Sequence, residues 1–155
     1  MITYQIDDWM ENLPKFKAIS IQHYDEIETL KEFPLDIDYD AYESIYKAGK
    51  LVFVTAKNGE ELVGYIVFFV MPHLHSKNCL TAHEDLYFLK PEYRKGYNGI
   101  KMFQFAQEHL KKIGVDLVLY ATKFEFDNSS LFRYLGCKPI DKVFTKLLQQ
   151  PIIRH

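Results

Sequence analysis

The chain has 155 residues, of which 19 are Lys or Arg and 21 are Asp or Glu, so its formal net charge is −2. A chain of this length with 48% hydrophobic residues can bury a full core without disulfides or metal ions. The near-neutral charge argues against nucleic acid as the main partner, because nucleic-acid-binding proteins usually carry a basic excess. Two cysteines are too few for a disulfide framework.

No segment has the pattern of a membrane span or an export signal. The longest apolar run, residues 62–71, is far shorter than the ~20 residues that a transmembrane helix needs. The amino terminus lacks the basic start and apolar stretch of a signal peptide. We therefore expect a cytoplasmic protein with no membrane partner. No repeat or linker divides the chain, which predicts one domain over residues 1–155.

The hydrophobic pattern predicts helices and strands in mixed order. In chain order, we expect helices over residues 25–30 and 39–48, strands over 51–57, 61–71 and 80–89, a helix over 98–113, a strand over 115–121, a helix over 129–135 and a last strand over 138–147. Asn58-Gly59 favours the positive φ angles of a tight turn between the first two strands. The apolar run at 115–121 is typical of a strand that is buried on both faces. Together these elements predict a mixed α/β fold.

The segment from Leu86 to Lys101, LYFLKPEYRKGYNGIK, is the most informative about function. A strand leads into a glycine-bearing turn and then into a helix start, where unpaired backbone N–H groups and the helix dipole favour an anion. Four basic side chains accompany only one acidic one in this segment. The pattern predicts a phosphate site, with a solvated basic loop as the alternative. Walker and dinucleotide glycine patterns are absent, so neither a nucleoside triphosphate nor a nicotinamide cofactor is implied.

These residues and the order of elements together resemble the GCN5-related N-acetyltransferase (GNAT) family. In that family, a Gln/Arg-x-x-Gly-x-Gly/Ala loop after a central strand binds the pyrophosphate of acetyl-coenzyme A through its amides. Here Arg94-Lys95-Gly96-Tyr97-Asn98-Gly99 supplies the first and last positions, and Tyr97 stands where the middle glycine is expected. The resemblance implies a mostly antiparallel, twisted mixed sheet with helices on both faces. It also implies acetyl-coenzyme A bound by this loop.

The resemblance extends over about residues 19–147. Residues 23–27, HYDEI, and 72–75, PHLH, resemble more specifically a GNAT subgroup common in bacteriophage genomes, which would place the protein in the host cytoplasm. Members of the family often dimerise through late strands, so a homodimer is a further expectation.

The same resemblance indicates where acyl transfer would occur. The oxyanion would be met by a backbone N–H near Phe88 and Leu89, at the end of the central strand. A carboxylate upstream would take the proton of the acceptor amine, and Glu84 and Asp85 are the candidates. Neighbours on a regular strand face opposite sides, so at most one would point into the acceptor cleft. A regular strand favours Glu84 and a β-bulge would reverse the choice, while two plain polar residues near a strand start are the alternative.

Substrate contacts are predicted in two places. Tyr24 and Glu26 belong to the early helices, which commonly form the acceptor wall in the family and are acidic here, as suits a cationic amine; a solvated acidic face is the alternative. His73 and His75, with His83 on the partner strand, offer a base near neutral pH, or more simply surface-loop histidines. Their spacing alone is weak evidence for a metal site, and none is predicted.

The sequence therefore predicts an N-acetyltransferase that moves an acetyl group from acetyl-coenzyme A to a primary amine by direct attack. The acceptor would be a small molecule or a protein. Phe132 stands where the family frequently has a tyrosine that protonates the departing thiolate. The alternative is a catalytically inactive GNAT-like module that binds a host protein.

Overall fold

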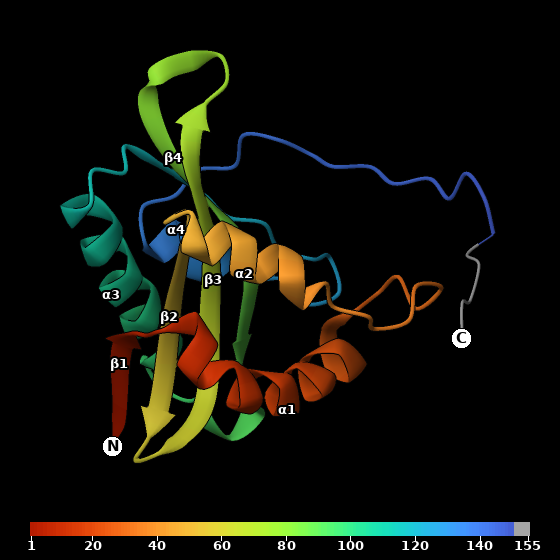
Figure 1. The fold of residues 1–155 in the computed structure, drawn as a ribbon, viewed down its shortest axis with the longest axis vertical. Coiled ribbons are helices and arrows are strands. Elements are labelled where there is room, and N and C mark those ends of the chain that lie inside the picture. The colour runs from red at the N-terminus through yellow and green to blue at the C-terminus, as the bar shows by residue number, and fades with distance from the viewer. Residues whose placement is uncertain (151–155) are drawn as a thin grey trace.

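The computed structural model describes residues 1–150 and consists of one five-stranded sheet with helices on both faces (Figure 1). In chain order the elements are β1 (Ile2–Ile6), α1 (Trp9–Ile27), α2 (Tyr39–Lys47), β2 (Leu51–Asn58), β3 (Glu61–His73), β4 (Ser76–Leu89), the 3-10 helix η1 (Pro91–Tyr93), α3 (Asn98–Lys112), β5 (Leu117–Leu119) and α4 (Ser129–Tyr134). The strands lie in the order β1-β2-β3-β4-β5. The first four are antiparallel, and β5 runs parallel to β4. The predicted mixed α/β fold class is confirmed; residues 151–155 of the predicted domain lie outside the described residues.

An apolar core lies on each face of the sheet. The α1 and α2 face is aromatic, with Trp9, Phe16, Phe53, Tyr65 and Phe88 buried in it. The opposite face packs against α3 and α4 and includes Val54, Phe68, Met102, Phe103 and Leu110. Because β2 and β3 carry nearly continuous apolar runs, alternate side chains supply both cores at once.

The amino-terminal region differs from the prediction. The helix expected over residues 25–30 is wrong, because α1 begins at Trp9 and ends at Ile27, and the strand β1 precedes it. Asp8 caps the helix by accepting a hydrogen bond from the Glu11 N–H at 3.0 Å. Two of the five buried positions of α1, Asn12 and Ser20, are polar and bond to nearby carbonyls, which weakens the helical hydrophobic pattern.

The two hairpins are close to the prediction but longer. Asn58 pairs with Glu61, so the turn residues are Gly59 and Glu60, and only Gly59 has a positive φ, +62°. The strand β3 continues to His73 and β4 begins at Ser76, beyond the ends predicted for both. The hairpin they form projects above the helices (Figure 1).

The later helices are confirmed, and the last strands differ from the prediction. The helices predicted over residues 39–48, 98–113 and 129–135 correspond to α2, α3 and α4. The strand predicted over 115–121 is shorter than expected, because only Leu117–Leu119 pair, and it is not buried on both faces, because these residues are partly exposed. The strand predicted over 138–147 is wrong: residues 138–150 form neither helix nor strand, and every one is exposed.

Candidate active site

A β-bulge in β4 creates the site. Val67 of β3 pairs with Leu86 and Phe68 pairs with Glu84, so Asp85 is an extra residue with no partner on β3. The parallel pairing of β4 with β5 ends just before this point, at His83 and Leu119. The two strands therefore separate where the bulge turns the side chains of β4, as bulges commonly do next to functional sites.

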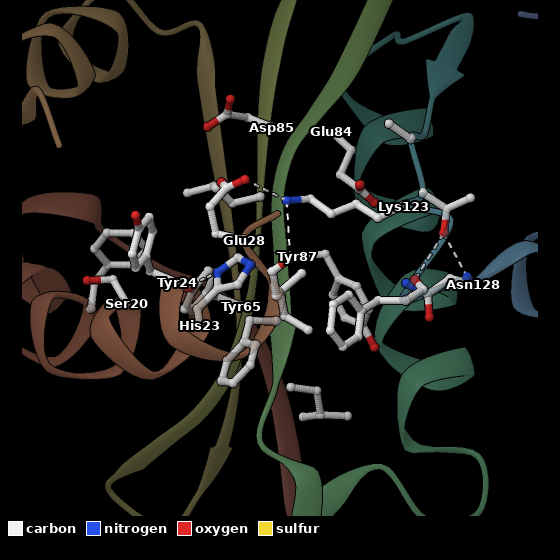
Figure 2. Close-up of a pocket in the computed structure, with 18 of the residues that line it drawn as sticks. Ser20, His23, Tyr24, Glu28, Tyr65, Glu84, Asp85, Tyr87, Lys123 and Asn128 are labelled. Atoms are coloured by element: carbon white, nitrogen blue, oxygen red, sulfur yellow. Dashed lines mark hydrogen bonds and ion pairs between the residues drawn. The ribbon is translucent and has the colours of Figure 1, made fainter. Parts of the chain in front are cut away.

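A central cavity of about 610 Å³ opens at this separation. Its walls come from α1, α2, the bulged part of β4 and the loop that follows β5 (Figure 2). The titratable side chains that line it are His23, Tyr24, Glu28, Tyr42, Tyr65, Glu84, Asp85, Tyr87, Arg94, Lys123 and Asp127. Apolar residues such as Phe16 and Phe88 form much of the remaining wall. A concave cavity with converging polar groups and an apolar part of its wall is the usual form of a small-molecule site.

The adjacent carboxylates Glu84 and Asp85 both line this cavity, on opposite sides of β4 (Figure 2). The expectation that only one would face the cleft is therefore wrong, because the bulge and the strand separation expose both sides of β4 to one space. The Tyr42 hydroxyl donates a hydrogen bond to Asp85 Oδ2. Burial raises the pKa of Asp85, and this bond acts in the opposite direction.

The Glu84 side chain is the less solvated of the two. Its Oε2 atom is buried and has no hydrogen-bond partner. Burial, with a smaller contribution from the Asp85 charge, raises the pKa of Glu84 to about 8, while the backbone of Ala121 lowers it. Glu84 therefore takes up and releases a proton near neutral pH, which is the range a general base requires.

His23 and Tyr65 form a hydrogen-bonded pair in the wall opposite. His23 Nδ1 lies 2.6 Å from the Tyr65 hydroxyl, and its ring stacks on Phe88 with centroids 4.9 Å apart. Burial, assisted by the Lys123 charge, lowers the pKa of His23 to about 4. His23 is therefore neutral at physiological pH and contributes shape and hydrogen bonding rather than charge.

Lys123 connects the two sides of the central cavity. Its Nζ lies 3.2 Å from Glu28 Oε1 and 3.3 Å from the Ile27 carbonyl oxygen, at the carboxyl end of α1 (Figure 2). The lysine follows β5, so the ion pair ties the loop after β5 to α1.

A second cavity of about 400 Å³ lies beside the first, at the start of α3. Its lining residues are Tyr87, Leu89, Arg94, Gly96, Gly99, Ile100, Asn128, Ser130, Leu131 and Tyr134. Four of them, Tyr87, Leu89, Arg94 and Asn128, also line the central cavity. The two cavities therefore share a wall at the end of β4.

The turn before α3 has backbone amides that the helix does not use, and Gly96 and Gly99 of this turn line the second cavity. The first backbone bond of α3 runs from the Lys101 N–H to the Tyr97 carbonyl at 2.8 Å, so the amides of the preceding turn are not used by the helix. Gly96 has φ +62° and open space where a Cβ would stand, which leaves its backbone accessible. The Asn98 side chain donates to the Tyr93 carbonyl at 3.0 Å and fixes the turn. This geometry fits a diphosphate, which helix amino termini bind through their amides.

The predicted cofactor residues divide into two groups. Phe88, Leu89, Arg94, Gly96 and Gly99 line the cavities, whereas Lys95, Tyr97 and Asn98 belong to the same turn but are not lining residues. Arg94 does not project freely as a phosphate ligand, because its Nε donates to the Leu89 carbonyl at 2.6 Å and its Nη1 pairs with Glu26. Arg94 and Glu26 thus join the turn, the end of β4 and α1.

Of the predicted substrate residues, some line the central cavity and others lie away from it. Tyr24 lines the central cavity, with its hydroxyl bonded to the Phe33 carbonyl at 2.7 Å. His73 and His75 lie at the β3–β4 turn and line neither cavity, because the hairpin carries them past the end of the helices. Within residues 1–150, no group of three or more His, Cys, Asp or Glu side chains has a metal-binding arrangement.

Tyr87 was not singled out from the sequence. It follows the bulge by two residues and lines both cavities, and a Cβ placed on Gly99 would lie 3.2 Å from its hydroxyl oxygen. Burial raises the pKa of Tyr87 to about 12, so it holds its proton at neutral pH. A tyrosine in an aromatic-rich strand gives no signal of this position, and neither does Lys123 in its own segment. Only the fold brings them to the cavity.

A model of the acetyltransferase (GNAT) family matches residues 13–136, and the chain belongs to this family. Solved structures share its fold over nearly their whole length. One is a predicted acetyltransferase with acetyl-CoA from Clostridium acetobutylicum, with 15% identity, 96% of this chain and 97% of that chain covered, and a TM-score of 0.73. Another is glucosamine-6-phosphate N-acetyltransferase from Arabidopsis thaliana, with 14% identity, 96% and 99% covered, and a TM-score of 0.71.

A third similar structure is an aminoglycoside acetyltransferase from an uncultured soil metagenomic sample in complex with sisomicin. Its identity is 12%, the coverage is 96% of both chains, and the TM-score is 0.71. At these identities the likeness establishes the GNAT fold. A comparison with curated protein sequences found no match. Among the described residues, no helix combines the length and apolarity needed to cross a membrane.

Proposed function

We propose that the protein is an N-acetyltransferase that transfers the acetyl group of acetyl-coenzyme A to a primary amine by direct attack. The observation that carries this proposal is the bulge at Asp85. It brings the carboxylates Glu84 and Asp85 into one cavity, next to a second cavity at the start of α3. Membership of the GNAT family supports acetyl transfer in general.

The turn from Arg94 to Gly99 would hold the cofactor. Its amides would bind the diphosphate, Lys95 would add positive charge, and Gly96 lets a phosphate approach the backbone. The bound cofactor supplies an activated thioester. Leu89 lines both cavities and Phe88 lines the central one, and at this end of β4 a backbone N–H would stabilise the developing oxyanion.

The carboxylates would prepare the acceptor. In its ionised form Glu84 would take the proton of the acceptor ammonium, and its raised pKa narrows the gap to the pKa of the amine. Asp85, held by Tyr42, adds negative charge on the other side of β4 and attracts a cationic acceptor. Glu28 is a third carboxylate at the cavity, paired with Lys123.

The departing thiolate would receive a proton from Tyr87. Phe132, at the position where a tyrosine would be expected, has no hydroxyl and is buried against Tyr120, with ring centroids 4.8 Å apart. Tyr87 lies where the two cavities meet and is protonated at neutral pH. These two observations support Tyr87 as the proton donor in place of Phe132.

The acceptor is proposed to be an amine on a small molecule or a protein. The structure in complex with sisomicin provides a precedent for an amine-rich ligand on this fold. Phe132 also motivates a second candidate, a catalytically inactive module that binds a host protein. That candidate predicts a stoichiometric partner whose binding does not depend on coenzyme A.

Titration calorimetry with acetyl-coenzyme A tests the proposal. We expect binding that weakens with salt and becomes roughly 10-fold weaker in Lys95→Glu, because the charge reversal lies beside the diphosphate. Lys112→Glu at the opposite end of α3 is the matched control and should bind as the wild type does. No binding at millimolar cofactor would refute the cofactor assignment. Binding without thiol release for any amine in a diverse panel would favour the inactive module.

A further inference from the structure

The central cavity combines an aromatic wall with a pair of carboxyl groups. Its aromatic lining comes from three elements and includes Phe16, His23 and Tyr24 of α1, Tyr65 of β3 and Phe88 of β4. The His23 and Phe88 rings stack with their planes 16° apart. In the view of Figure 2, the carboxyl groups of Glu84 and Asp85 lie above the rings of His23, Tyr24 and Tyr65. A ligand in this cavity therefore meets carboxyl groups on one side and rings on another.

Both cations that line the cavity are engaged by carboxylates at the carboxyl end of α1. Arg94 Nη1 pairs with Glu26, and Lys123 Nζ lies 3.2 Å from Glu28 Oε1. Neither cation is therefore available to bind an anionic acceptor. Figure 2 shows the Lys123 side chain extending from the loop after β5 to Glu28, so it bridges two walls of the cavity. A bridged cavity favours a compact ligand over an extended polypeptide, which needs an open groove.

The carboxylates leave one position for a cation. Within residues 1–150, the Glu84 Oε2 atom has no hydrogen-bond partner, and Asp85 has a hydroxyl donor, Tyr42, but no ion pair. Asp127 also lines the cavity but accepts a bond from the Ser129 N–H at 2.8 Å, at the start of α4. An ammonium group beside Glu84 and Asp85 would contact both. A second ammonium would lie against the rings without a carboxylate, and burying an unpaired charge is costly.

The rest of the wall suits an apolar, flat body. Leu35, from the loop between α1 and α2, and Phe126, from the loop after β5, line the cavity and are partly exposed. They continue the apolar lining toward solvent, where a ligand could cover them and gain from the burial. Ring-to-ring contacts in stacked or edge-on geometry add to this gain, so the wall favours an aromatic ligand.

We propose that the acceptor is a small primary amine with one ammonium group on a short chain and an aromatic body. The inference rests on the proposed function, because it names the acceptor of the same site. The ammonium lies beside Glu84 and Asp85, and the ring packs against the aromatic wall. The ammonium loses one proton to Glu84, and its nitrogen forms the amide bond as the thioester C–S bond breaks. The nitrogen then loses a second proton and the thiolate gains one, so an acetamide, the thiol and one released proton result.

Thiol release and calorimetry with the full chain test the acceptor class. With acetyl-coenzyme A, kcat/KM for 2-phenylethylamine should exceed that for spermidine and for a lysine-containing peptide by about 100-fold. With coenzyme A in place of the acetylated cofactor, calorimetry should show that 2-phenylethylamine binds. Faster transfer to spermidine or to the peptide would overturn this acceptor class and leave the transferase in place. Binding of 2-phenylethylamine without thiol release would refute the transferase and support the ligand class, whereas no binding would overturn the inference whatever the activity.

Two phenylalanines of one loop provide a matched pair of variants. Phe126 lines the central cavity and is 37% exposed, whereas Phe124 lines neither cavity and is 97% exposed. Phe126→Ala should weaken the binding of 2-phenylethylamine about 10-fold, and Phe124→Ala should bind it as the wild type does. Equal affinities of the two variants for 2-phenylethylamine would overturn the placement of its ring against this wall.

Discussion

Glu84 and Asp85 are adjacent in sequence, yet their surroundings differ. Asp85 accepts a hydrogen bond from Tyr42, whereas Glu84 has a buried oxygen atom with no partner. Burial therefore dominates at Glu84 and raises its pKa to about 8. Two carboxylates with separated pKa values can take different roles, one as a proton acceptor and the other as a fixed charge.

The pH dependence of kcat/KM tests the role of Glu84. A general base must be ionised, so kcat/KM should rise with pH and level off above the folded pKa of about 8. Glu84→Gln should lower kcat/KM by about 100-fold and abolish this rise of kcat/KM with pH. Asp85→Asn, assayed with the same acceptor, should keep the rise. A wild-type rate and profile in Glu84→Gln would exclude Glu84 as the base.

Replacement of Tyr87 by Phe tests the proton donor. Because a thiol has a pKa near 8.5, thiolate is a tolerable leaving group, and Tyr87→Phe should lower kcat by only about 10-fold. The matched control Tyr120→Phe removes a hydroxyl that bonds to Gln107 and lines neither cavity, so it should leave kcat unchanged. Equal kcat values for Tyr87→Phe and wild type, measured by thiol release, would leave water as the proton source.

At the scale of the elements, the close approach of β3 and β4 sets the position of the site. Gly64 of β3 pairs with Leu89, and a Cβ at Gly64 would lie 2.7 Å from Leu89 Cδ1 and 2.8 Å from the Phe88 carbonyl oxygen. Three residues further along the pairing, the bulge begins. The glycine contact and the bulge together fix the end of β4 against the turn that leads into α3.

Gly64→Ala should therefore lower the free energy of unfolding by about 2 kcal/mol, because backbone of β4 must shift to admit the methyl group. Chemical denaturation measures this loss, and calorimetry should show weaker acetyl-coenzyme A binding because Phe88 and Leu89 move. Gly59→Ala in the β2–β3 turn is a matched control: its positive φ makes it strained by about 1 kcal/mol, without a change in cofactor binding. If Gly64→Ala and Gly59→Ala bind acetyl-coenzyme A with equal affinity, the β3–β4 contact does not position the site.

At the scale of the whole molecule, the site lies between two packed cores. The aromatic core holds α1 and α2 against one face of the sheet, and the other core holds α3 and α4. The cavities open where β4 and β5 separate, so the sheet cannot fill this space with its own side chains. Burying an ionisable carboxyl such as Glu84 in that opening lowers stability at high pH.

This cost gives a prediction for the pH dependence of stability. The folded pKa of Glu84, about 8, exceeds the ordinary value of 4.5, so the folded state holds a proton that the unfolded state has lost between these values. The contribution of Glu84 to the free energy of unfolding therefore falls as pH rises through this range. Glu84→Gln should be more stable than wild type by on the order of 3 kcal/mol near pH 9, with a difference near zero at pH 4. Thermal unfolding across pH measures the difference, and a constant difference would contradict the assignment.

Local patterns in the sequence were sufficient for much of the fold. The three-and-four spacing in α3, the glycine stops after three helices and the turn glycine at Gly59 all act through short-range geometry, and the structure confirms these helices and the hairpin. Membership of the GNAT family, indicated by the turn from Arg94 to Gly99, is also confirmed. The sequence did not predict the full length of α1, because polar residues occupy part of its buried side.

The tertiary structure decided the features that depend on contacts distant in sequence. A bulge is a mismatch between two strands, so the register of β3 on β4 alone shows that Glu84 and Asp85 share one cavity. Tyr87, Lys123 and Tyr42 reach that cavity from separate elements. Residues 138–147 have the composition of a strand, but a strand also needs a neighbour, and the described structure leaves this segment exposed and unpaired. Pairing partners are a property of the folded molecule and its assembly, which explains why the sequence alone could not supply them.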